Sequence, residues 1–164
     1  MDKLITELLA LLRELLAGQE RLLALALARR EAMRTFDMPR LETMAGQERA
    51  ETVRMAELDK RRLALTGRMR AVLGGGTPAT VSEVAKRVEE PARSQLLGLA
   101  AQLKETMEKV ERNSRINATV SETVVKGLAK VLKVVTGLAQ HAGLYMRNGR
   151  KAALHGVHLL EVTA

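Results

Sequence analysis

Hydrophobic residues recur at steps of three and four along residues 92–140 of this chain. These residues are Leu96, Leu99, Leu103, Met107, Val110, Val124, Leu128, Val131, Val135 and Leu138. Such steps keep one residue from each turn on a single stripe, which is the pattern of a helix that packs in a coiled coil. The pattern therefore predicts one long helix over residues 92–140.

The first half of the chain contains two further helical patterns, over residues 3–35 and 39–73. The first is rich in leucine, and Gly18 falls where its stripe would place another leucine. Between the two patterns, Asp37 can cap the second helix while Pro39 occupies its first turn. The sequence thus predicts two long helices joined by a short turn.

Residues 74–78, Gly-Gly-Gly-Thr-Pro, end the second helix, because glycine suits a helix C-terminus and proline cannot continue one. A short helix is expected over residues 81–90, capped by Thr80 or Ser82. After residue 143 come a turn signal and an amphipathic segment of about 12 residues, a length that is marginal for a helix alone in water. We therefore expect a bundle over residues 1–143 and a separate tail over residues 144–164.

The composition selects the all-α class. Aromatic residues make up only 1% of the chain, which is rich in Ala, Leu, Glu, Arg, Lys and Met. These are strong helix formers, whereas strands favour aromatic and β-branched residues. We expect an elongated antiparallel helical bundle with coiled-coil-like packing. Its expected core includes Leu8, Leu15, Leu103, Val110, Leu128 and Val131.

We expect no catalytic, cofactor or metal site, and hence no enzyme. The chain has no cysteine, which excludes disulfides and thiolate chemistry. Its glycine run lacks the Lys-Ser/Thr of a phosphate loop, and His155, His158 and Glu161 have no identifiable fourth ligand. The leucine-rich start carries too many charges to span a membrane. It also lacks the basic, then apolar, then small-residue order of a signal peptide, so a cytoplasmic protein is expected.

Positive charge is concentrated toward the C-terminus. The net charge is +8, and the residues from Arg112 onward hold eight Lys or Arg against two Glu. Such an end attracts acidic proteins, nucleic acids or anionic membranes, although the scarcity of aromatic residues disfavours recognition of bases. A scaffold coiled-coil protein and a basic helical nucleic-acid-binding protein stay open as alternatives, as does a homodimer.

Midway along the long pattern the stripe becomes polar. Residues 110–120 read Val-Glu-Arg-Asn-Ser-Arg-Ile-Asn-Ala-Thr-Val and resemble the late-helix signature of the FlgN family of flagellar export chaperones. That signature has two Asn residues three apart, so Asn117 matches the second Asn and Ser114 stands at the first. Further on, Tyr145 and Gly149 resemble the Tyr-x-x-x-Gly turn of that family. We expect Ser114 and Asn117 on the inward stripe, where they would fix the register of the helices.

The resemblance implies a cytoplasmic chaperone for hook–filament junction proteins of the FlgK and FlgL type. Such a protein would prevent the premature assembly of its clients and deliver them to the flagellar type III export apparatus. The tail is the expected client-binding segment, because its amphipathic helix needs something to pack against. Its expected contact residues are Tyr145, Leu154, Val157 and Leu160, with Arg147, Arg150 and Lys151 as a basic cluster.

Overall fold

The structure is a computed structural model that describes the backbone of residues 2–73 and 80–142, and the side chains of residues 2–71 and 80–137. Within these ranges the chain is helical and contains no strand. The all-α bundle predicted from the composition is thereby confirmed. The glycine-rich break and the tail from residue 143 onward lie outside the described residues.

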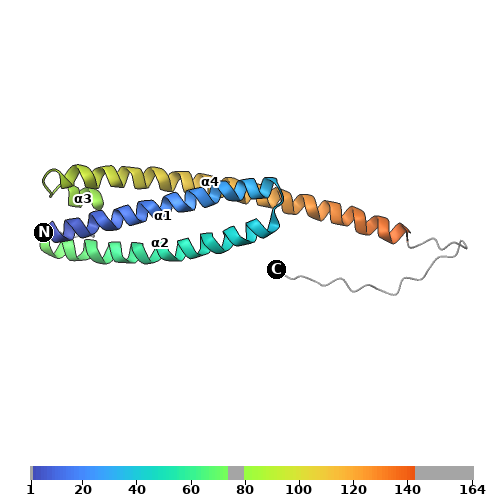
Figure 1. Cartoon of the computed structure of the whole chain (residues 1–164), viewed down its shortest axis with the longest axis horizontal. Coiled ribbons are helices and arrows are strands. Elements are labelled where there is room, and N and C mark those ends of the chain that lie inside the picture. The colour runs from blue at the N-terminus through green and yellow to red at the C-terminus, as the bar shows by residue number, and fades with distance from the viewer. Residues whose placement is uncertain (1, 74–79, 143–164) are drawn as a thin grey trace, which may run out of the picture. The chain divides into compact units, whose positions relative to one another are not determined.

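Four helices follow one another along the chain (Figure 1). They are α1 (Asp2–Arg34), α2 (Met38–Leu73), α3 (Val81–Ala85) and α4 (Ala92–Ala142). The three long helices match the predicted ones to within two residues at each end. The short helix ends at Ala85 and not at residue 90, because hydrogen bonds between residues three apart close turns over residues 84–88. Pro91 disfavours helical geometry in the residue before it.

The chain divides into two compact units, Met1–Val120 and Ser121–Ala164. In the first unit α2 runs back along α1, and the first part of α4 runs in the same direction as α1 (Figure 1). Contacts between α1 and α4 establish this direction, since Leu96 joins the cluster around Leu8 and Asn117 meets Ala26. The antiparallel order of consecutive long helices is that of an up-down-up bundle.

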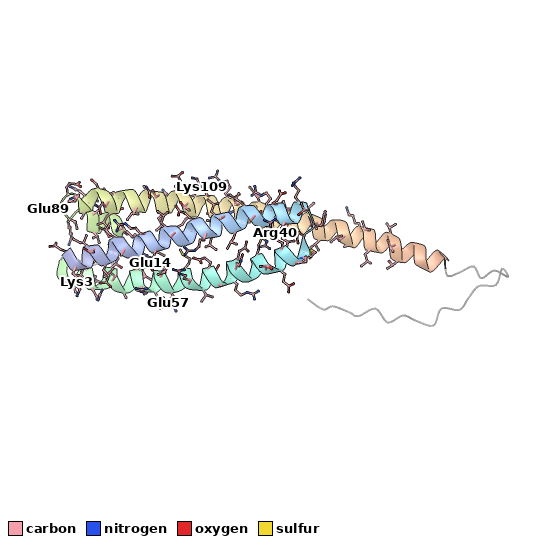
Figure 2. All side chains as sticks on the ribbon, in the orientation of Figure 1. Lys3, Glu14, Arg40, Glu57, Glu89 and Lys109 are labelled. Carbon is pink, nitrogen blue, oxygen red and sulfur yellow. The ribbon has the colours of Figure 1, made fainter. Side chains whose placement is uncertain are left out.

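The apolar core of the first unit lies among the start of α1, the end of α2, α3 and the start of α4. Its fully buried residues are Leu8, Leu12, Leu65, Met69, Val84, Ala85 and Leu96. Thr80 caps α3 in a capping box with Glu83, which places Val84 and Ala85 against this cluster. Charged side chains such as Lys3, Glu57 and Lys109 are exposed and project from the ribbon (Figure 2).

The predicted core residues divide into three groups. Leu8 and Leu15 are buried, as expected. Leu103 and Val110 are only half-buried. The prediction was wrong for Leu128 and Val131, whose side chains are 58% and 61% exposed. The helical period identified the correct face of α4, but the described residues leave that face open after residue 124.

The turn between α1 and α2 uses two local capping motifs. The N–H of Phe36 donates to the carbonyl of Met33, and the N–H of Asp37 donates to that of Ala32, which together form a Schellman motif. Phe36 holds the left-handed position of this motif with a φ of 54°. The carboxylate of Asp37 then accepts a hydrogen bond from the N–H of Arg40, as predicted for the cap of α2.

Gly18 brings α1 and α2 close together. It is buried, and a Cβ atom at its position would lie 2.1 Å from Sδ of Met55. The missing leucine in the α1 stripe is therefore the place where an α2 side chain occupies the surface of α1. No described helix is long and apolar enough to cross a membrane.

Candidate functional site

A polar cluster joins α1 to α4 inside the first unit. The guanidinium of Arg30 donates to Oδ1 of Asn113 at 2.7 Å and to Oδ1 of Asn117 at 3.4 Å. The side-chain amide of Asn117 donates to the carbonyl of Ala26 at 2.7 Å, and that of Asn113 donates to the carbonyl of Lys109 at 2.8 Å. Asn117 is buried, so these bonds fix one longitudinal position of α4 on α1.

The sequence identified part of this cluster. Asn117 is buried on the inward stripe, as predicted. Ser114 is exposed, so its predicted inward position was wrong. Asn113 takes that role because residues four apart share a helix face. The role of Arg30 was not predicted from the sequence. A basic residue on the leucine-rich α1 is an ordinary feature of an amphipathic helix and does not by itself indicate a contact with α4.

Ion pairs join α1 to α2 along their length. Arg21 meets Glu51 at 2.7 Å, Arg29 meets Glu48 at 2.8 Å and Arg68 meets Glu7 at 2.7 Å. The hydrogen bond from Arg21 lowers the pKa of the Glu51 carboxyl below its usual range. The same hydrogen bond raises the pKa of the Arg21 guanidinium. These pairs hold the helices in register, and none is a catalytic arrangement.

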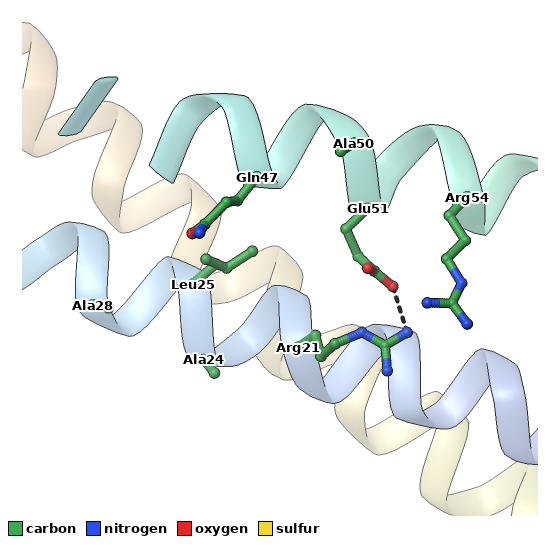
Figure 3. Close-up of a pocket in the computed structure, with 8 residues that line it drawn as sticks. All are labelled: Arg21, Ala24, Leu25, Ala28, Gln47, Ala50, Glu51 and Arg54. Atoms are coloured by element: carbon green, nitrogen blue, oxygen red, sulfur yellow. Dashed lines mark hydrogen bonds and ion pairs between the residues drawn. The ribbon is translucent and has the colours of Figure 1, made fainter. Parts of the chain in front are cut away.

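Two open grooves accompany these contacts in the first unit. One, of about 630 Å³, runs between α1 and α2, where the Arg21–Glu51 pair closes one end and Leu25 and Gln47 lie at the other (Figure 3). Ala24, Ala28 and Ala50 line this groove, and their small side chains leave space between the two helices. The other groove, of about 1000 Å³, lies over Leu12, Leu15 and Leu22 of α1 and is lined by residues of α2 and α4.

Among the side chains that the structure describes, the largest set of exposed apolar ones lies on α4 in the second unit. These residues, which we call the α4 face, are Val125, Leu128, Val131, Leu132 and Val135, each 55–64% exposed. Val124 extends the face and is half-buried. At about 100° per residue, the six side chains fall within roughly a third of the helix circumference. A face of this kind marks a site for another apolar surface.

The predicted client-binding residues lie outside the described residues. This holds for Tyr145, Leu154, Val157 and Leu160, and equally for Arg147, Gly149, Arg150 and Lys151. Their proposed role stays a prediction, as does the boundary between bundle and tail at residue 143. Among the side chains that the structure describes, no group of three His, Asp or Glu could hold a metal ion. His155 and His158 fall outside that search.

An exposed apolar face on a helix is a surface on which an amphipathic helix of another protein can pack. A comparison with family models identifies the family. The model of the FlgN protein matches residues 1–153, so the chain belongs to the FlgN family of flagellar export chaperones. This is a chaperone family and not an enzyme family. No curated protein and no solved structure matches the chain.

Proposed function

We propose that this protein is a cytoplasmic export chaperone for hook–filament junction proteins of the FlgK and FlgL type. It binds their terminal helices, prevents premature assembly and delivers them to the flagellar type III export apparatus. Membership of the FlgN family supports the general role. The observation that carries the binding mechanism is the exposed α4 face.

The α4 face has the form expected of a surface that receives an amphipathic helix. In heptad terms Val124 and Val131 occupy one seam position and Leu128 and Val135 the other. The positions that flank the seam, Val125 and Leu132, are apolar too. A client helix with an unfilled apolar face can therefore bury its side chains here, in the helix-in-groove mode of recognition.

The tail is the second part of the proposed client site. Leu154, Val157 and Leu160 share one face of an amphipathic pattern, and Tyr145 supplies a large amphipathic side chain. Arg147, Arg150 and Lys151 would increase the rate of association more than the affinity. Ordering such a short segment costs part of the binding free energy, so the affinity stays moderate.

Calorimetry with a terminal helical peptide of a hook–filament junction protein tests the proposal. We expect the double variant Leu128→Ser/Leu132→Ser to lose at least about tenfold in affinity, because each serine removes apolar area from the interface. The matched control, Val53→Ser/Leu63→Ser, changes two side chains of α2 that are 66% and 52% exposed. It should bind as tightly as the unchanged chain.

A chain that ends at Gly143 separates the tail from the α4 face. We expect it to keep its helical circular dichroism and cooperative melting, and to lose affinity for the peptide. If it bound at full affinity, the tail would have no part in the site. If the Leu128/Leu132 variant also bound at full affinity, the proposed mechanism would be wrong.

A further inference from the structure

The charge pattern of α4 changes at Glu122. Up to this residue, acidic side chains pair with basic ones four positions further on, as Glu105 does with Lys109 at 2.7 Å and Glu122 with Lys126 at 2.6 Å. The sequence contains no acidic residue from 123 to 160, and this stretch holds six Lys or Arg. The helix is therefore balanced in charge over its first part and purely basic after Glu122.

The basic side chains and the α4 face lie on opposite sides of the helix. Relative to Leu128, the residues Lys126, Lys130 and Lys133 are rotated by roughly 140–200°, at 100° per residue. All three lysines are exposed, and the side chain of Lys126 is 70% exposed. The described part of the second unit is thus a helix with an apolar side and a cationic side. Val134, which is 60% exposed, lies between them, about 40° from Lys130.

The two sides of the helix together fit one kind of partner better than a client helix or an acidic protein alone. A single helix packed on the α4 face covers only that face and cannot contact lysines on the far side. An acidic protein bound to the lysines would leave the apolar face in water. The boundary of an anionic bilayer satisfies both sides, because apolar side chains enter the acyl region while long lysines extend to the headgroups.

We infer that residues 121–137 of α4 also bind the surface of an anionic lipid bilayer, with the helix lying in the plane of the interface. One consequence rests on the proposed function. Client helix and bilayer use the same α4 face, so anionic membrane competes with the client and promotes its release there.

Vesicle co-sedimentation of the full chain without any client tests the inference. The probe is vesicles of phosphatidylcholine with about one-third phosphatidylglycerol, compared with pure phosphatidylcholine at the same ionic strength. We expect the chain to sediment with the anionic vesicles and to stay in the supernatant with the neutral ones. Added salt should weaken binding, since it screens the attraction.

Two triple variants with the same change of net charge separate a local site from general attraction. The test variant is Lys126→Gln/Lys130→Gln/Lys133→Gln. The control, in the first unit, is Lys60→Gln/Lys86→Gln/Lys104→Gln, and its three lysines are also exposed. We expect the test variant to lose roughly 100-fold in vesicle affinity, about fivefold per lysine, and the control to lose far less. Equal losses in both would overturn the inference.

The apolar contribution is tested with Leu128→Ser/Leu132→Ser. This variant should keep its helical circular dichroism and lose vesicle binding. Full vesicle binding by this variant, or no sedimentation of the unchanged chain, would overturn the inference. Peptide calorimetry in lipid-free buffer then reports on the proposed function separately, because a chain that binds the client and not the vesicles refutes only the membrane site.

Discussion

Asn117 is the buried polar residue on which the contact between α1 and α4 depends. Its amide and carbonyl groups are both used, by Ala26 and by Arg30. No buried side-chain polar atom lacks a hydrogen-bond partner among the residues that the structure describes. Removing one member of such a cluster leaves its partners unpaired in a poorly solvated place, which costs more than the bond itself contributes.

We expect Asn117→Ala to lower the free energy of unfolding by about 1–3 kcal/mol. Urea denaturation followed by circular dichroism measures this change. Ser114→Ala is the matched control, because the exposed Ser114 should shift stability by less than about 0.5 kcal/mol. The reverse order of the two effects would contradict the positions that the structure gives these residues.

At the scale of elements, the turn between α1 and α2 combines correct capping with one strained residue. Phe36 occupies the left-handed position of the Schellman motif, which glycine fills without a steric cost. Its side chain is 62% exposed, so packing within the described residues gives it little compensation. The left-handed conformation of Phe36 is therefore a local cost to stability.

We expect Phe36→Gly to raise the free energy of unfolding by about 1 kcal/mol, because it removes the steric cost of the left-handed conformation. A shift of the urea midpoint to higher concentration with an unchanged slope would show this.

Gly98→Ala is the comparison, in which a glycine is replaced and not introduced. A Cβ there meets open space within a helix, so this change should also stabilise, through helix propensity, by up to about 1 kcal/mol. A destabilised Phe36→Gly chain would mean that the ring makes contacts that outweigh the strain.

At the scale of the whole molecule, the apolar core and the exposed α4 face lie in different units. The buried apolar cluster belongs entirely to Met1–Val120. The described side chains of the second unit are mostly exposed, including those of the α4 face. This division suits the client site proposed above, because a surface that receives a client cannot also be filled by the protein's own core.

We therefore expect Leu12→Ala to cost about 2–5 kcal/mol, since its side chain is 1% exposed within the core cluster. Leu128→Ala should change the free energy of unfolding by less than about 0.5 kcal/mol, because more than half of that side chain is already in water. Both changes are measured by urea denaturation at one protein concentration, so that self-association does not contribute. Similar losses in the two variants would mean that the α4 face is covered.

The sequence by itself determined the four helices, the approximate bounds of the three long ones and the Asp37 cap, and it narrowed the cap of α3 to Thr80 or Ser82. These features depend on interactions between residues a few positions apart, such as the Thr80–Glu83 capping box and the Asp37 cap. The apolar stripe on α4 could also be predicted from the sequence, because residues that recur with the helical period of 3.6 lie on one face of the helix. The polar interruption at Asn117 and its resemblance to the FlgN signature also required no coordinates.

Only the tertiary structure decided what lies opposite each face. Leu96 and Leu128 occupy the same stripe, yet one is fully buried and the other is 58% exposed. In the sequence Gly18 is only a gap in the leucine stripe of α1, and the position of Met55 shows that the helices approach closely there. Asn113 replaced Ser114 because Arg30, 83 positions away in the chain, reaches that side of α4. A periodic pattern reports which side chains share a face, but burial depends on residues far away in sequence, and local periodicity carries no information about them.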